Sequence, residues 1–161
     1  MDEIKASTGM SARARPEILA MKGYVSARSL VATDGSTVFL DANECPYEPF
    51  VGASGLARYP MQQPLELVRA ICDWLDLSSR NVTVARGADE GIDCLMRAFC
   101  VPAVDNIIIC PPTFAMYAQS ALLQGVEVRK VPLADDFGLD TGGIMAAVDG
   151  GTKMVFVCSP N

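Results

Sequence analysis

Arg86 to Asp93 reads Arg-Gly-Ala-Asp-Glu-Gly-Ile-Asp and follows the apolar segment Val82–Ala85, which predicts a strand. After it, apolar residues recur at helical steps: Ile92, Leu95, Met96, Phe99 and Cys100. The sequence therefore predicts a strand that turns through Gly87 into a helix. The first N–H groups of a helix have no partner within it and lie at the positive end of its dipole. We expect this turn to be a site that can hold a phosphate.

The same stretch also has a purely structural interpretation. Asp89 would then be the N-cap, with acidic side chains favoured by the helix dipole. A capping box counted from Asp89 would need Glu or Gln at position 92, which is Ile. If a phosphate binds, the backbone N–H groups of Ala88, Asp89 and Glu90 must hold it, and the two carboxylates must point away. The stretch alone leaves both interpretations open.

Strand and helix patterns alternate along the rest of the chain. A helix is predicted from Leu65 after Pro64, a residue favoured at helix starts, with Ser78-Ser79 as its end. The other predicted strands are 38–40, 107–110, 126–131 and 154–158, and the other predicted helices are 113–124, followed by Gly125, and 143–149. This order predicts an α/β fold with a mostly parallel sheet and crossover helices.

Three segments with polar or aromatic residues begin where predicted strands end. They start at Gly87, Pro111 and Ser159. Ligands of parallel sheets bind beyond the carboxyl ends of the strands, so one shared site is expected there. In it Phe114 could lie over a flat heterocycle and Asn161 could donate to a ligand oxygen. The alternatives are a core aromatic residue and an ordinary turn residue.

Composition excludes several classes of function. The 161 residues are 50% hydrophobic and 20% charged, which indicates a globular chain, and the net charge of -6 argues against a nucleic-acid surface. The chain has no histidine and none of its six cysteines forms a C-x-x-C pair, so neither a zinc site nor any other metal site is predicted. Because free thiols suit a reducing compartment and no secretory or membrane segment is visible, we expect a cytoplasmic protein that does not contact membranes.

Five segments together resemble histidinol-phosphate aminotransferases, which are class II aminotransferases of the aspartate-aminotransferase-like fold, known as fold-type I. The resemblance runs from about Tyr24 to Asn161. Its most specific parts are Asn43-Glu44-x-Pro46, Arg58-Tyr59-Pro60, Arg86 to Ile92, Cys110 to Tyr117 and Val157 to Asn161. The resemblance implies pyridoxal 5'-phosphate as the cofactor. It also implies a homodimer with shared active sites.

The resemblance assigns roles to particular residues. Backbone N–H groups of Ala88, Asp89 and Glu90 would hold the cofactor phosphate, and Tyr59 would reach the phosphate of the neighbouring subunit's cofactor. Phe114 would stack on the pyridine ring, where close relatives have tyrosine, and Asn161 would bond the phenolic oxygen. Tyr24 and Asn43 would meet the substrate, Tyr24 near its phosphate and Asn43 near its amino-acid end.

The resemblance also implies the reaction, an interconversion of L-histidinol phosphate plus 2-oxoglutarate with imidazole-acetol phosphate plus L-glutamate in histidine biosynthesis. It places the Schiff-base lysine beyond Asn161, so no catalytic residue is expected in this chain, which would be inactive alone. None of Lys5, Lys22, Lys130 and Lys153 stands at the family's position. Residues 1–32 are expected to form an N-terminal arm, and residues 33–161 an incomplete part of the cofactor-binding large domain.

Other functions stay open at this point. Within the same superfamily they are an aromatic-amino-acid aminotransferase and a decarboxylase that uses the same cofactor. Outside it, the alternative is a non-catalytic α/β domain that binds phosphate.

Overall fold

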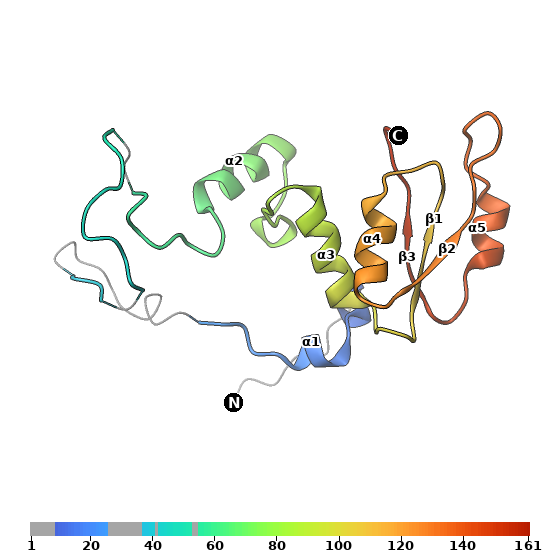
Figure 1. Ribbon diagram of the computed structural model, residues 1–161, viewed down its shortest axis with the longest axis horizontal. Helices are drawn as coiled ribbons and strands as arrows, with labels where there is room; N and C mark the ends of the chain where they lie inside the picture. The colour runs from blue at the N-terminus through green and yellow to red at the C-terminus, as the bar shows by residue number, and fades with distance from the viewer. Residues whose placement is uncertain (1–8, 26–36, 41, 53–54) are drawn as a thin grey trace. The chain divides into compact units, whose positions relative to one another are not determined.

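The computed structural model describes residues 9–25, 37–40, 42–52 and 55–161 (Figure 1). The chain forms two compact units. One combines the described residues up to Met21 with Ala85–Asn161, and the other is Lys22–Val84. Within the described part of the chain, no helix has both the length and the apolar character needed to cross a membrane. The predicted division into residues 1–32 and 33–161 stays a prediction.

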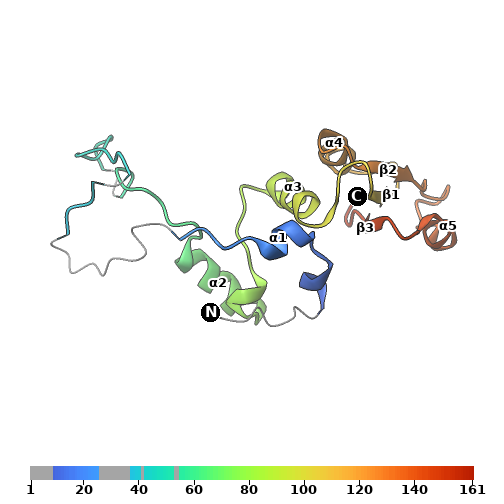
Figure 2. The ribbon, with the colours of Figure 1, turned by 90° about the horizontal axis from the view of Figure 1, so that it is seen from below.

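A three-stranded parallel sheet organises the first unit. Its central strand is β1 (Asn106–Ile109), flanked by β2 (Glu127–Lys130) and β3 (Thr152–Phe156) in the order β2-β1-β3. Helix α4 (Met116–Leu123) connects β1 to β2, and α5 (Thr141–Ala147) connects β2 to β3. The two connecting helices lie on opposite sides of the sheet (Figure 2). The predicted parallel α/β arrangement with crossover helices is confirmed.

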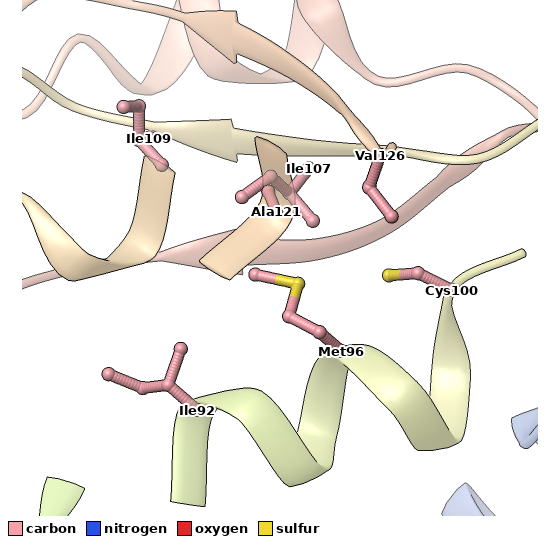
Figure 3. Packing of buried hydrophobic residues seen from close by; sticks show 7 residues of the cluster. All are labelled: Ile92, Met96, Cys100, Ile107, Ile109, Ala121 and Val126. Carbon is pink, nitrogen blue, oxygen red and sulfur yellow. The ribbon is translucent and has the colours of Figure 1, made fainter. Parts of the chain in front are cut away.

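Helix α3 (Ala88–Phe99) and α4 cover one face of the sheet. The fully buried members of this core include Met96, Ile107 and Ala121. In Figure 3, Ile92 lies at the end of the core near Ile109, while Cys100 lies at the other end. Helix α3 therefore runs antiparallel to β1, and its N-terminus lies at the edge where the strands have their carboxyl ends.

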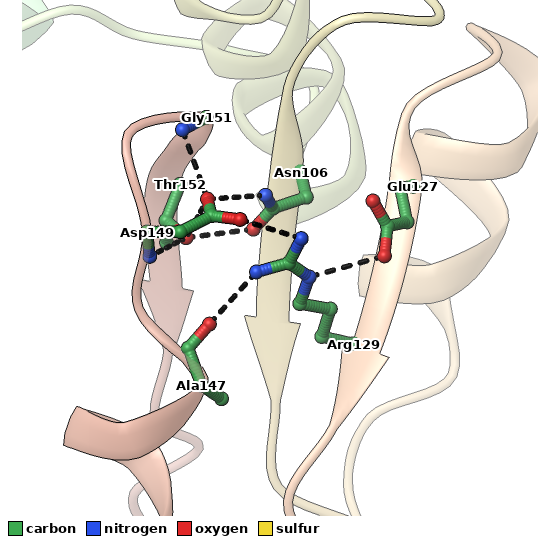
Figure 4. A network of polar contacts seen from close by, with 7 residues as sticks. All are labelled: Asn106, Glu127, Arg129, Ala147, Asp149, Gly151 and Thr152. Carbon is green, nitrogen blue, oxygen red and sulfur yellow. Dashed lines mark hydrogen bonds and ion pairs between the residues drawn. The ribbon is translucent and has the colours of Figure 1, made fainter.

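A polar network closes the opposite edge of the sheet, where the strands begin (Figure 4). The Asp149 carboxylate accepts a hydrogen bond from Asn106 Nδ2 at 3.0 Å and forms an ion pair with Arg129 Nη2 at 2.7 Å. Arg129 also donates to the carbonyl of Ala147 at the end of α5, with a distance of 2.9 Å. The Thr152 hydroxyl donates to Asn106 Oδ1 at 2.8 Å. The network thus joins all three strands to α5.

The start of α3 differs from the structural interpretation of the sequence. Gly87, not Asp89, is the N-cap, with φ 87° and ψ 179°, a conformation that favours glycine. Counted from Gly87, the third helical residue is Glu90, and its carboxylate accepts a hydrogen bond from the backbone N–H of Arg86. The side chain of Glu90 therefore reaches back over the helix start, much as in a capping box.

Two predicted strands are absent from the described residues. Val82–Ala85 forms no strand. The side-chain amide of Gln63 instead supplies both partners of the Val84 backbone: Gln63 Oε1 accepts from Val84 N at 2.8 Å, and Gln63 Nε2 donates to Val84 O at 3.0 Å. Residues 38–40 form no strand, and Val38 and Leu40 are exposed. Both segments have the pattern of a strand, but neither has a neighbouring strand among the described residues.

The remaining helices lie close to their predicted positions. Helix α2 (Leu65–Leu75) buries Val68 and Cys72, and it ends before Ser78 because Asp76 takes a left-handed conformation with φ 52°. Ser78 instead caps the short 3-10 helix η3 (Ser79–Asn81). Residues near the N-terminus contain two short helices that the sequence did not predict, the 3-10 helix η1 (Met10–Arg13) and α1 (Pro16–Ala20).

Candidate cofactor site

The loops that follow β1 and β3 meet at the carboxyl edge of the sheet. The side chain of Asn161 donates from Nδ2 to the carbonyl of Pro112 at 2.6 Å, which ties the segment after β3 to the loop after β1. Helix α3 presents its N-terminus at the same edge (Figure 3). The structure thereby joins the predicted segments that begin at Pro111 and Ser159, and it places the start of α3, after Gly87, at the same edge of the sheet.

The start of α3 is open to solvent. Gly87, Ala88 and Asp89 are exposed, and a Cβ placed on Gly87 would meet no atom within 4 Å. The first backbone N–H groups of the helix have no carbonyl of a preceding turn to bind. Together they form a set of donors, at the positive end of the helix dipole, that fits a phosphate group.

The acidic side chain of Glu90 forms an ion pair with Arg86. Arg86 Nη2 lies 2.8 Å from Glu90 Oε1, and Arg86 Nε donates to the same oxygen at 3.1 Å. These hydrogen bonds hold the pKa of the Glu90 carboxyl below its ordinary value. The expectation that the Glu90 carboxylate points away from the helix start is therefore wrong, and its charge is instead compensated by the guanidinium of Arg86.

Phe114 lies outside helix α4, which begins at Met116 and not at the predicted Thr113. Its ring is 42% exposed and packs edge-on against Tyr117, with centroids 5.6 Å apart. Tyr117 in turn stacks on Phe156 of β3 at 4.5 Å. The interpretation of Phe114 as a core residue of this helix is wrong, because Phe114 is partly exposed and precedes the helix.

Two contacts of Cys158 were not predicted from the sequence. A hydrogen bond between the Tyr117 phenol and the Cys158 thiol, with burial, raises the pKa of Tyr117 above its ordinary value. Cys158 Sγ also donates to the carbonyl of Pro160 at 3.4 Å. Tyr117 and Cys158 are far apart in sequence, so no local pattern signals their contact.

The other predicted site residues, Tyr24, Asn43 and Tyr59, belong to the Lys22–Val84 unit. Tyr24 and Tyr59 are largely exposed, and the Tyr24 carbonyl accepts from Gln62 Nε2 at 3.3 Å. Asn43 has a left-handed backbone with φ 51°. The roles of these residues toward a substrate or a cofactor stay predictions.

Two lysines in the sheet have identifiable surroundings. Lys153 lies 3.6 Å from the buried carboxylate of Asp105, which precedes β1 and so belongs to the edge opposite the candidate site. Lys130 is the last residue of β2 and is exposed. Lys22 is exposed in the other unit, and Lys5 lies outside the described residues.

Curated relatives resemble most of this chain. A "Histidinol-phosphate aminotransferase 1" of Haemophilus influenzae is 45% identical over 149 residues, which cover 91% of this chain and 42% of that protein. A histidinol-phosphate aminotransferase of Yersinia enterocolitica is 43% identical over 157 residues, covering 96% of this chain and 41% of that protein. The chain thus spans about two fifths of the length of these relatives.

A solved structure shares the fold. It is an Erwinia carotovora atroseptica protein, provisionally assigned as a histidinol-phosphate aminotransferase, with a TM-score of 0.55 and 22% identity over 62% of this chain and 29% of that one. A family model described as "Aminotransferase class I and II" matches residues 39–161, more than half of the sequence. The chain therefore belongs to the class I and II aminotransferases.

Proposed function

We propose that this chain supplies the cofactor-binding part of a pyridoxal 5'-phosphate-dependent aminotransferase of histidine biosynthesis. The reaction would interconvert L-histidinol phosphate plus 2-oxoglutarate with imidazole-acetol phosphate plus L-glutamate. The observation that carries the proposal is the meeting of an open helix start, an exposed aromatic ring and an amide at one edge of a parallel sheet. The names of the curated relatives support the choice of substrate.

Each part of the site fits one part of the cofactor. The N–H groups of Ala88, Asp89 and Glu90 would bind the phosphate, which is the only dianionic group of the molecule. The ring of Phe114 would lie against the flat pyridine, and Asn161 would donate to its phenolic oxygen while its second amide N–H stays on Pro112. When bound, the cofactor supplies the aldehyde that carries the amino group and the ring that draws electrons from it.

The other unit would supply substrate and subunit contacts. Tyr24 and Asn43 would bind the phosphate and the amino-acid end of the substrate, and Tyr59 would reach the cofactor phosphate of a second subunit in a homodimer. We propose that none of the four lysines performs proton transfer and that residues 1–161 alone do not turn over substrate. Such an enzyme would act in the cytoplasm.

The test uses an extended protein, defined as residues 1–161 followed by the remaining sequence of the Haemophilus influenzae relative. Glutamate formation from L-histidinol phosphate and 2-oxoglutarate is measured for this protein and for residues 1–161 alone. We expect turnover by the extended protein only. Tyr24→Phe should raise the KM for L-histidinol phosphate several-fold and leave the KM for 2-oxoglutarate unchanged.

Two results would contradict the proposal. A folded extended protein that binds no pyridoxal phosphate would refute the cofactor site. An extended protein that binds the cofactor but prefers L-phenylalanine, or releases carbon dioxide from its substrate, would transfer the assignment to an aromatic-amino-acid aminotransferase or to a decarboxylase.

A further inference from the structure

Two carboxylates of one loop hold the backbone that carries Tyr59. Glu48 accepts hydrogen bonds from three successive backbone N–H groups, those of Gly55 at 2.9 Å, Leu56 at 3.1 Å and Ala57 at 3.2 Å. Glu44 accepts a hydrogen bond from the backbone N–H of Tyr59, further along the same segment. All of these residues lie within the Lys22–Val84 unit, so the contacts are internal to one compact body.

Of the two carboxylates, only Glu44 binds the backbone of Tyr59 itself. Its Oε1 accepts from the backbone N–H of Tyr59 at 2.6 Å, and its Oε2 accepts from Arg58 Nη1 at 3.2 Å. The Glu44 side chain is only 5% exposed, whereas that of Arg58 is 60% exposed. Hydrogen bonds to an ionised carboxylate are stronger than those between neutral groups, and burial strengthens them further. Glu44 therefore fixes the backbone at Tyr59 more firmly than an ordinary loop contact would.

The side chain of Tyr59 is exposed, although its backbone N–H is held by Glu44. The residue is 68% exposed. Ordering a loop backbone costs conformational entropy, and no buried side chain of Tyr59 offsets that cost. An anchored backbone with an exposed phenol is the arrangement expected of a side chain held in readiness for a partner outside its own unit.

We propose that Glu44 is a positioning residue that holds Tyr59 for contact with the cofactor phosphate. This inference rests on the proposed function, which assigns the phosphate to Tyr59. Asn43, the residue proposed to meet the substrate, directly precedes Glu44 in the same loop. Glu44 itself does not touch cofactor or substrate in this proposal and acts through Tyr59.

The first experiment measures hydrogen exchange of individual backbone amides in residues 1–161. Glu44→Gln keeps the size of the side chain but removes its charge, and we expect the Tyr59 amide to exchange about 10-fold faster. Glu48→Gln is the matched control, because it removes the same charge from the same loop. It should accelerate exchange at Gly55, Leu56 and Ala57 and leave the Tyr59 amide unchanged.

The second experiment measures the dissociation constant of pyridoxal phosphate in the extended protein. Tyr59→Phe removes the phenol hydroxyl and should weaken binding about 10-fold, as the loss of a hydrogen bond to a charged group would. Glu44→Gln should weaken binding by a similar factor. If Glu44 acts through Tyr59, the double variant should bind no more weakly than Tyr59→Phe alone, since the two changes remove one interaction.

Each outcome decides the proposal. Faster exchange at Tyr59 in Glu44→Gln alone, together with non-additive losses of affinity, would support it. Unchanged exchange at Tyr59, or losses that multiply in the double variant, would overturn the positioning role. If the extended protein binds no pyridoxal phosphate, the proposed function fails and the positioning role fails with it. If Tyr59→Phe binds the cofactor normally, only the role of Tyr59 and its support by Glu44 are overturned.

Discussion

At the scale of single residues, Asp149 is a charged group that binds neighbouring strands away from the candidate site. Its carboxylate accepts from Asn106 Nδ2, pairs with Arg129 and accepts from the backbone N–H of Gly151 at 2.9 Å. These contacts, the one from Asn106 first, hold the pKa of Asp149 well below its usual range. The ionised form is therefore favoured in the folded state.

A pH dependence follows from this lowered pKa. The contribution of Asp149 to stability should be present above about pH 4, the ordinary pKa of aspartate, and should be lost as the pH falls through the lower folded value. Asp149→Asn should therefore lower the urea midpoint at pH 7 and lower it less at pH 2. Asp73→Asn, at an exposed position of α2, is the control. An equal deficit at both pH values would contradict the role of the ionised carboxylate.

In the proposed site, Phe114 is the residue that would stack on the cofactor ring. Ring stacking is worth about 0.5–1.5 kcal/mol beyond the area buried, so Phe114→Leu should raise the dissociation constant of pyridoxal phosphate roughly 2- to 10-fold in the extended protein. Phe114→Tyr keeps the ring face and should bind as tightly as the natural residue. Equal affinity of the leucine variant would show that the ring of Phe114 does not contact the cofactor.

At the scale of elements, the end of α4 shows why a glycine stands at position 125. Gly125 has φ 69°, its N–H donates to Leu122 O at 3.0 Å, and the N–H of Val126 donates to Ala121 O at 2.9 Å. This pair of bonds is the Schellman motif, and it leads the chain directly from the helix into β2. Val126 and Ala121 are both buried in the core cluster, so the turn also places an apolar contact.

The two glycines at positions 125 and 91 should respond to alanine in opposite ways. Gly125→Ala forces a Cβ into the left-handed conformation and should destabilise the protein by about 1–2 kcal/mol. Gly91 lies inside α3, where a methyl group would meet no neighbouring element within 4 Å, so Gly91→Ala should stabilise the protein by about 0.5–1 kcal/mol. Urea denaturation of both variants measures the difference. A destabilising effect at position 91, or none at position 125, would contradict these assignments.

Elements with a strong local pattern could be predicted from the sequence. Ile107 to Cys110 is buried throughout, as its continuous apolar run indicates, and the period of α3 places Ile92 and Met96 in the core. Helix boundaries were less predictable, because Gly87 and Asp76 set them through backbone conformation and not through the apolar pattern.

Long-range partners could not be predicted from local pattern. Gln63 satisfies the backbone of Val84 in place of a strand, and no periodicity signals a side chain that does this. For the same reason the contact of Asn161 with Pro112, and that of Glu44 with Tyr59, became visible only in the fold. The sequence indicated which segments are candidates for the site, whereas the structure shows which contacts hold them.

At the scale of the whole molecule, the two edges of the parallel sheet, where the strands begin and where they end, carry different groups of residues. The edge where the strands begin is closed by the network around Arg129 and Asp149 (Figure 4). The edge where the strands end carries an open helix start, Phe114 and Asn161. Because a parallel sheet directs all its strand ends to one side, residues from three distant segments lie at that edge, where we propose the cofactor site.

The central claim is that the N-terminus of α3 holds the cofactor phosphate. The most direct measurement is a titration of isotopically labelled residues 1–161 with pyridoxal phosphate, followed by the backbone amide signals in NMR spectra, with pyridoxal, which lacks the phosphate, as the control. The account predicts that pyridoxal phosphate shifts the amide signals of Ala88, Asp89 and Glu90 and that pyridoxal leaves them in place. Equal shifts with both compounds, or shifts confined to other parts of the chain, would contradict it.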